Sequence, residues 1–311
     1  MSRIHEALKK AEQERAATRT GALPDPTPVL PVESPVLPEI AAPRVPDPAL
    51  ASPMMPNFAS PFSVDTMLAR CPQLLWKPDV GTMLFMNGDD NKRGTEEFRT
   101  LRSRLYHMRE KMTLRKLLVT SALPKEGKSF TSSNLAQVLV RQHGRRVLLI
   151  DADLRGPRLH LMLGTTSSPG LSEYLQGKND EFSIMQRGPM ENLFFIPSGA
   201  GIEDPAEMVG NGKLKILLQR VEPLFDWIII DSPPAIPVSD ASVLAKACDG
   251  VLMVVRSNST PSDAARRARA EFPDQALVGL VLNGTSDEAI PYARYYYETY
   301  EKRETTNRLV L

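Results

Sequence analysis

The sequence predicts an α/β protein built on a doubly wound, mostly parallel β-sheet. Strand-like and helix-like segments alternate over about 170 residues, which is typical of this class. Short apolar runs of the kind that form buried parallel strands recur along the chain. Three of these runs end in residues suited to binding phosphate or metal. Because crossovers between parallel strands are right-handed, helices are expected on both faces of the sheet.

The first of these runs leads into a loop at the centre of the predicted site. Residues 116–129 read KLLVTSALPKEGKS, in which 117–119 form a strand and a helix begins after Ser129. A helix N-terminus offers free backbone N–H groups to an anion. Lys128 is placed to reach the outer phosphates and Ser129 to ligate Mg²⁺. Ala122 stands where the pattern GxxxxGK[ST] has its first glycine, so an ordinary strand-to-helix turn is the alternative.

Two further apolar strands end in carboxylates. The stretch RVLLIDADLR carries Asp151, Asp153 and Arg155 at its end, and DWIIIDSPP carries Asp231. In open parallel sheets ligands bind beyond the carboxyl ends of the strands, and an acidic residue in the position of Asp231 holds the Mg²⁺ shell of many nucleotide hydrolases and kinases. A single Asp would more simply cap a helix. Three such strand ends together favour a nucleoside triphosphate site.

The stretches SALPKEGKS, LLIDADLR and IIIDSPP resemble the Walker A, Walker A′ and Walker B motifs of the bacterial tyrosine kinases, or BY-kinases, which drive exopolysaccharide and capsule export. The resemblance runs from about residue 96 to the C-terminus and implies a P-loop NTPase fold with ATP and Mg²⁺ as cofactors. The nucleotide-binding residues are then Pro124, Lys125, Glu126, Gly127, Lys128, Ser129, Phe130 and Asn283, the metal ligands Ser129, Asp153 and Asp231, and the catalytic residues Lys128, Asp151, Asp153 and Arg155.

Some of these roles stay open at the level of the sequence. Asp151 or Asp153 must accept a hydrogen bond from the tyrosine hydroxyl, which is neutral at pH 7 because its free pKa is near 10. We assign the base to Asp151 and a metal or water ligand to Asp153. Arg155 either stabilises charge or binds a neighbouring subunit. Asn283, at the end of the last strand, either touches the nucleotide base, as in related proteins, or is an ordinary turn residue.

Composition sets limits on the rest of the molecule. A chain of 311 residues with 42% hydrophobic content is enough for one core domain with extensions. The net charge of +1 gives no global field that would favour nucleic acid, and no nucleic-acid partner is expected. Two distant cysteines suit a reducing cytoplasm. Because no apolar run reaches the roughly 18 residues of a membrane span, a cytoplasmic protein is expected, recruited to the inner face of the membrane by a partner.

The N-terminal part divides into two predicted regions. Residues 1–20 form a helix that docks on a partner protein, with a frayed terminus as the alternative. Residues 21–90 form a disordered Pro-rich linker and a transition, because 12 prolines between Gly21 and Pro61 favour extended polyproline II. In the transition the sequences LLW and MLF indicate pieces that pack on the kinase domain, which is predicted to span 91–290.

A predicted helix over residues 94–111 opens this domain, with Thr95 as its cap. Its buried face is predicted to consist of Phe98, Leu101 and Leu105. Glu96, Arg99 and Arg102 recur every three residues and are expected in one exposed arc. This E-x-x-R-x-x-R pattern is similar to the motif through which BY-kinase subunits pack into a ring. A solvated helix face is the alternative.

The remaining elements follow in alternation. The helix after the phosphate loop places Leu135, Val138 and Leu139 on one face and is predicted to end near His143, with Gly144 as its cap. The elements after it are predicted at 147–151 (strand), 168–177 (turn and short helix), 192–197 (strand), 204 onward (helix), 227–231 (strand), 241–247 (helix), 250–256 (strand), 262–272 (helix) and 277–283 (strand).

Residues 291–311 form a predicted tyrosine-rich tail. Five of the seven tyrosines in the chain lie here, namely Tyr292, Tyr295, Tyr296, Tyr297 and Tyr300. The C-terminal tyrosine cluster of BY-kinases implies that they are phosphoacceptors. An amphipathic helix that packs its rings on the domain is the alternative.

The resemblance as a whole implies an ATP-dependent protein-tyrosine autokinase. It would phosphorylate its own tail in trans within a ring homo-oligomer and so regulate exopolysaccharide polymerisation and export. A separate membrane co-polymerase or activator protein would be its partner. The alternative is a partitioning-type switch ATPase, which recruits partners without phosphorylating tyrosine. Such ATPases carry an additional lysine early in the phosphate loop, where this chain has Leu123.

Overall fold

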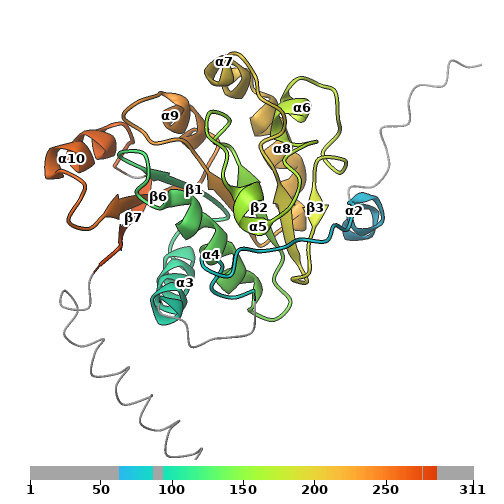
Figure 1. The fold of residues 1–311 in the computed structure, drawn as a ribbon, viewed down its shortest axis with the longest axis horizontal. Coiled ribbons are helices and arrows are strands. Elements are labelled where there is room, and N and C mark those ends of the chain that lie inside the picture. Colours follow the sequence, from blue (N-terminus) through green and yellow to red (C-terminus); the bar gives the residue numbers. More distant parts are fainter. Residues whose placement is uncertain (1–62, 87–93, 275, 286–311) are drawn as a thin grey trace, which may run out of the picture. The chain divides into compact units, whose positions relative to one another are not determined.

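The computed structural model describes residues 63–86, 94–274 and 276–285, all within one unit, Asn57–Leu311. In this part of the chain one seven-stranded sheet is present (Figure 1). Its strands are β1 (Lys116–Ser121), β2 (Val147–Asp151), β3 (Gln186–Arg187), β4 (Leu193–Ile196), β5 (Trp227–Asp231), β6 (Gly250–Arg256) and β7 (Leu277–Asn283). The helices are α2 (Val64–Arg70), α3 (Thr95–Arg109), α4 (Lys128–Val140), α5 (Leu159–Leu163), α6 (Leu171–Leu175), α7 (Pro205–Gly210), α8 (Lys213–Val221), α9 (Asp240–Ala245) and α10 (Ser262–Ala270), and the 3₁₀ turn Glu222–Leu224 follows α8.

The strand order is β3-β4-β2-β5-β1-β6-β7. All neighbouring pairs are parallel except β3, which runs antiparallel to β4. Strands β2 and β5 are buried along their whole length and β1 at every residue after Lys116, because helices cover both faces of the sheet. The predicted doubly wound, mostly parallel fold is confirmed.

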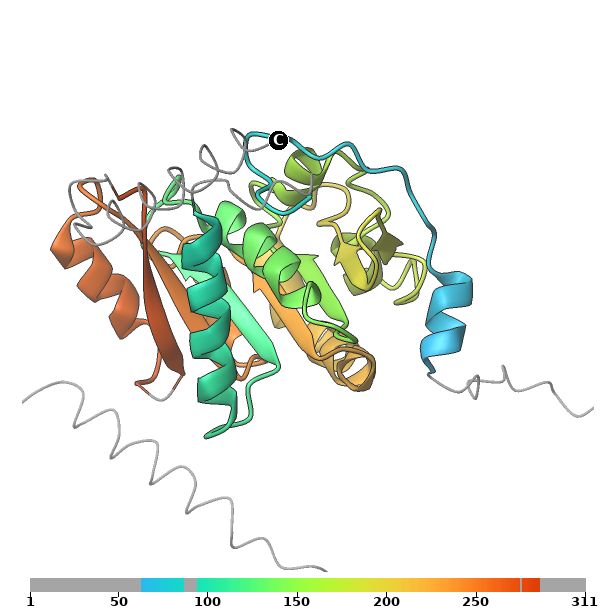
Figure 2. The ribbon, with the colours of Figure 1, turned by 90° about the horizontal axis from the view of Figure 1, so that it is seen from below.

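Two hydrophobic cores lie on the two faces of the sheet. One is built with α3, α4 and α5, and the other with α6, α8, α9 and α10. Figure 2 shows α3 and α4 side by side in front of the sheet. Phe98 and Leu105 of α3 are buried in the first core, as predicted, whereas Leu101 is only partly buried. No helix among the described residues is both long and apolar enough to cross a membrane.

Several predicted boundaries need correction. Gly94, and not Thr95, is the N-cap of α3, and it adopts a left-handed conformation with φ of 96°. Helix α4 ends at Val140, three residues before the predicted end, because the chain turns at residues 141–144 to reach β2. Helix α4 is also buried on every side and not on one face alone. The sequence analysis missed α2, α5, α8 and the two-residue strand β3.

Residues 72–86, here called the strap, pass from the edge strand β3, where Gln73 forms a bridge with Arg187, to the first core, and they form no helix. Their backbone exchanges hydrogen bonds with Arg187 of β3 and with the turn after α5, where Lys77 donates its N–H to the Gly164 carbonyl. Gly164 has a φ of 63°, and an added Cβ would meet the Lys77 oxygen at 1.8 Å. Trp76, Met83 and Phe85 are buried. The packing suggested by LLW and MLF is therefore present.

Two amides of α4 hold the end of the strap. The Leu84 N–H donates to Oδ1 of Asn134 at 2.8 Å, and Nδ2 of Asn134 donates to the Thr82 carbonyl at 2.8 Å. The Phe85 N–H donates to Oε1 of Gln137 at 3.2 Å. Asn134 and Gln137 are fully buried, so the strap meets polar groups that water does not reach.

Three regions of the sequence analysis lie outside the described residues. These are the predicted docking helix at 1–20, the Pro-rich stretch up to residue 62, and the tail at 291–311 with Tyr292, Tyr295, Tyr296, Tyr297 and Tyr300. The expectations for these regions stay predictions.

The strap contact predicts the effect of Asn134→Ala. This change leaves the buried N–H of Leu84 and the partly buried carbonyl of Thr82 without their partner, so we expect the free energy of unfolding to fall by about 2–3 kcal/mol. Urea unfolding followed by circular dichroism measures it. The control is Gln142→Ala, which changes an exposed amide beyond α4 and should cost less than about 0.5 kcal/mol. Equal losses in the two variants would contradict the role of Asn134.

Candidate nucleotide and phosphotransfer site

The candidate site lies at the carboxyl ends of β1, β2 and β5. Asp151 ends β2 and Asp231 ends β5, and the register of the two parallel strands places them directly side by side. Because neighbouring strands lie about 4.8 Å apart, two carboxylates meet here at close range. Helix α4 begins at Lys128, directly after the loop that leaves β1. The topology alone therefore brings the three predicted motifs together.

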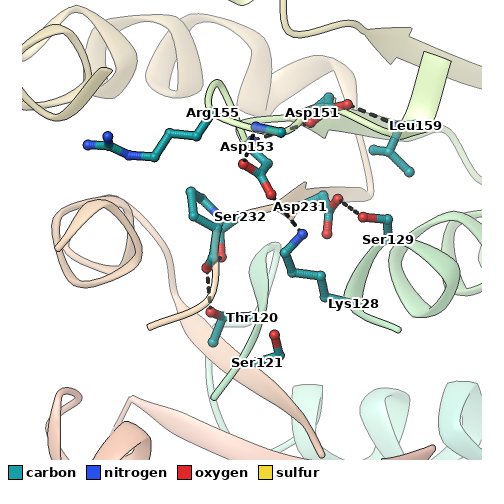
Figure 3. Close-up of polar contacts among 12 residues, drawn as sticks. Thr120, Ser121, Lys128, Ser129, Asp151, Asp153, Arg155, Leu159, Asp231 and Ser232 are labelled. Carbon is teal, nitrogen blue, oxygen red and sulfur yellow. Dashed lines mark hydrogen bonds and ion pairs between the residues drawn. The ribbon is translucent and has the colours of Figure 1, made fainter. Parts of the chain in front are cut away.

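Lys128 reaches into the middle of this group (Figure 3). Its Nζ donates to Oδ2 of Asp153 at 2.7 Å, and both side chains are largely buried. Burial alone would lower the pKa of Lys128, but the carboxylates of Asp231 and Asp153 outweigh it and raise the pKa. Lys128 therefore stays charged, and its charge is balanced by protein carboxylates in this conformation.

Asp231 is held through both of its oxygens. Ser129 donates its hydroxyl to Oδ2 at 2.6 Å, and Ser132 donates to Oδ1 at 3.0 Å. The carboxylate is fully buried. Burial raises the pKa of Asp231 to about 6, although Lys128 and the two serine hydroxyls act in the opposite direction. Both serines lie on the face of α4 that packs against β5, because residues three apart share a helix face.

Asp151 has different surroundings. Its Oδ2 accepts the Leu159 N–H at 3.1 Å and its Oδ1 accepts the Asp153 N–H at 3.3 Å. Figure 3 shows its carboxyl turned toward Leu159, whereas Asp153 faces Lys128. Complete burial raises the pKa of Asp151 to about 8, and the neighbouring Asp231 adds to the shift.

The phosphate loop is fixed by contacts from β6 and β7. Gly127, the N-cap of α4, has a φ of 98°, and an added Cβ would meet Nδ2 of Asn283 at 1.9 Å, so only glycine fits. The same Nδ2 donates to the Glu126 carbonyl at 2.9 Å. Lys125 also has a positive φ of 65°, and Arg256 donates to its carbonyl at 3.2 Å. Strained backbone of this kind concentrates at functional sites.

The comparisons with known proteins agree with this geometry. Residues 125–263 match the family model described as AAA domain. Tyrosine-protein kinase YwqD of Bacillus subtilis (strain 168) is 33% identical over 192 residues, which cover 61% of this chain and 81% of YwqD. The chain belongs to the bacterial tyrosine kinases. Its enzyme class is that of protein-tyrosine kinases, and its phosphate loop is a P-loop nucleotide site.

Two more similar proteins show which share of each chain the similarity covers. The kinase domain of the Escherichia coli tyrosine kinase ETK has a TM-score of 0.61 and 30% identity, over 65% of this chain and 80% of that structure. Tyrosine-protein kinase wzc of Salmonella typhimurium is 30% identical over 222 residues, or 71% of this chain. This chain spans only 31% of the length of wzc.

Not every side chain of the predicted nucleotide set faces the site. Pro124 is exposed and has no N–H to donate. Glu126 is buried, where Oε2 accepts the Leu123 N–H at 2.7 Å and Oε1 accepts the Thr260 hydroxyl. The ring of Phe130 packs on Phe98 of α3, with centroids 5.8 Å apart. Whether these residues bind nucleotide stays a prediction, which for Glu126 and Phe130 rests on their backbone.

Arg155 points away from Lys128 and Asp153 (Figure 3). Its guanidinium donates to both oxygens of the buried Asp240 at the start of α9, at 2.7 and 3.1 Å. In this conformation Arg155 contacts α9 and none of the other predicted catalytic residues. Its catalytic role stays a prediction that requires Arg155 to leave Asp240.

The residues of the predicted subunit interface on α3 are not equally exposed. Glu96 is exposed and pairs with Arg99 within the helix. Arg102 is half-buried and donates to the Val138 carbonyl of α4 at 3.1 Å, where the end of a helix leaves carbonyls without intrahelical partners. Arg99 is likewise only partly exposed, so the expectation of one exposed arc is confirmed for Glu96 alone. Their interface role is untested.

Ser132, which contacts Asp231, is not among the site residues predicted from the sequence. The signal was its spacing, because it follows Ser129 by three residues on the same helix and so faces the same strand. The segment FTSSN contains too few apolar residues to show a helical period. The face of α4 that carries Ser132 was therefore not evident from the sequence.

The raised pKa of Asp151 predicts a pH-dependent stability. The folded kinase holds a proton on Asp151 from about pH 4 to about pH 8 that the unfolded chain releases, so its stability falls as pH rises through this window. Asp151→Asn removes this titration. When the pH is raised from about 6 to about 8, the free energy of unfolding of both proteins can fall. We expect this fall to be about 2 kcal/mol smaller in the variant than in the wild type.

Urea unfolding at the two pH values measures this difference. Asp263→Asn, which changes an exposed carboxylate of α10, is the control and should follow the wild type. Parallel pH profiles for the wild type and Asp151→Asn would show that Asp151 is ionised in the folded kinase already at the lower pH.

Proposed function

We propose that this kinase transfers the γ-phosphoryl group of ATP to its own C-terminal tyrosines, Tyr292, Tyr295, Tyr296, Tyr297 and Tyr300. The observation that supports this most directly is the convergence of Lys128, Asp153 and the Ser129–Asp231 pair at the carboxyl ends of three parallel strands. Phosphoryl transfer needs a positioned γ-phosphate, balanced charge and an acceptor for one proton. These residues can supply all three.

The residues present fit a Mg²⁺-bound nucleoside triphosphate. Gly127, which Asn283 approaches closely, is the N-cap of α4, and the free N–H groups at the start of this helix would bind an anion. Hydroxyl and carboxylate oxygens are ligands that Mg²⁺ prefers, so Ser129 and Asp231 would hold the ion together with the phosphates. When bound, Mg·ATP supplies the phosphoryl group and neutralises the charge that develops on it.

Lys128 and Asp153 exchange partners in the proposed mechanism. Lys128 turns from Asp153 toward the outer phosphates, where its positive charge is needed. Asp153 then loses its cation and becomes available to accept the tyrosine proton. We therefore favour Asp153 over Asp151 as the base, because both oxygens of Asp151 accept backbone N–H groups and the carboxyl is fully buried. Asp151, whose pKa is raised to about 8 by burial, would then stay protonated at neutral pH.

The reaction is proposed to occur in trans within a ring of identical subunits. The similarity of Glu96, Arg99 and Arg102 to a ring-packing motif supports this, and such packing would bring the tail of one subunit to the site of the next. Each phosphate adds nearly two negative charges. Several phosphates close to Glu298 and Glu301 would repel one another and open the ring. We propose that this cycle regulates exopolysaccharide polymerisation together with a membrane-bound activator.

Incubation with Mg·ATP followed by intact mass and peptide mapping tests the activity. We expect phosphate on residues 292–300 of the wild type and a loss of at least about a hundredfold in Lys128→Met, because electrostatic stabilisation of the transferring group is removed. Phosphate on other residues only would overturn the proposed acceptor. Nucleotide binding without any phosphate on tyrosine, with and without a membrane activator, would favour the switch ATPase.

A mixing experiment separates the trans reaction from the cis reaction. One protein keeps Lys128 but has its five tail tyrosines changed to phenylalanine. It is mixed with the Lys128→Met variant, which keeps all five tyrosines. In trans, phosphate appears on the inactive Lys128→Met chains. If these chains stay unmodified while the intact wild type phosphorylates itself, the reaction occurs in cis.

A further inference from the structure

The hydroxyl of Ser132 lies between two oxygen atoms. It lies 3.0 Å from Oδ1 of Asp231 and 2.9 Å from the carbonyl of Lys128, one helical turn earlier. A hydroxyl has one proton, so it donates to one of these oxygens at a time. A charged acceptor forms the stronger hydrogen bond. Donation to Asp231 is therefore favoured while the carboxylate is ionised.

We propose that Ser132 is a positioning residue that fixes the carboxylate of Asp231 for metal coordination. This inference rests on the proposed function, in which Ser129 and Asp231 hold Mg²⁺. Ser129 binds Oδ2 and Ser132 binds Oδ1, so the carboxylate is held at both oxygens. A carboxylate held at one oxygen can rotate about its terminal torsion, which is a soft degree of freedom. The second serine removes that freedom.

Burial makes this restraint effective. Ser132 and Asp231 have no exposed surface, so water does not replace the hydroxyl if it is removed. Helix α4 and strand β5 are regular elements, and sites built on such elements hold their geometry better than sites on loops. A misplaced carboxylate should therefore lower the affinity for the metal.

The next residue provides a matched control. Ser133 is also fully buried on α4, but its hydroxyl donates to the carbonyl of Phe130 at 3.1 Å. This bond is local to the helix and reaches none of the predicted metal ligands Ser129, Asp153 and Asp231. Ser133→Ala therefore removes the same atoms from the same helix without touching Asp231.

The test compares ADP binding with and without Mg²⁺ by isothermal titration calorimetry. The measured quantity is the ratio of the two affinities, which reports the metal and not the nucleotide contacts. We expect Ser132→Ala to reduce this ratio by about tenfold, as the loss of a hydrogen bond to a charged group predicts. Ser133→Ala should leave the ratio within about twofold of the wild type. Ser132→Thr, which keeps the hydroxyl, should restore most of the loss.

The outcomes separate positioning from structure. If Ser132→Ala weakens ADP binding equally with and without Mg²⁺, the serine only supports the fold and the proposal is overturned. An unchanged ratio in Ser132→Ala, or an equal loss in Ser133→Ala, overturns it as well. A wild type that binds ADP more tightly with Mg²⁺ but phosphorylates no tyrosine would refute the proposed function alone.

Discussion

The site is governed by the close approach of buried carboxylates around one lysine. Asp151 and Asp231 are register neighbours on adjacent parallel strands, and Asp153 follows two residues after Asp151. Charges out of water are costly unless they are paired. The raised pKa values of Asp151 and Asp231 and the pairing of Asp153 with Lys128 are two responses to the same cost. The proposed Mg²⁺ would lower the same cost, because a bound cation would pair with the buried carboxylate of Asp231.

Helix α4 connects this site to the rest of the domain. Its first turn carries Lys128 and Ser129, its middle holds the strap through Asn134 and Gln137, and the Val138 carbonyl near its end accepts Arg102 of α3. Each contact uses a buried polar group, which fixes the rotation of the helix more strictly than apolar packing does. The orientation of the two phosphate-loop side chains is thereby tied to two segments outside the loop.

The sequence predicts the strands well because long apolar runs leave few alternatives. The predicted bounds of β2, β5, β6 and β7 match the structure. The short elements α5 and β3 have too few residues to show a period, whereas α8 was recognisable from Leu214, Leu217, Leu218 and Val221 at helical spacing. The pairing of Lys128 with Asp153 was within reach, because the motifs name both residues. The partner of Arg155 was not, since Asp240 lies 85 residues later and its approach depends on tertiary structure.

The strap has a further consequence for how this domain tolerates change. Asn134 and Gln137 bind it through main-chain atoms of residues 82, 84 and 85, and β3 and the turn after α5 do the same for its first half. Main-chain groups are the same for every residue except proline. An exposed position of the strap such as Leu75 can thus change in sequence while the attachment persists. The strap can therefore stay attached to the catalytic core through its main chain even where its exposed side chains change.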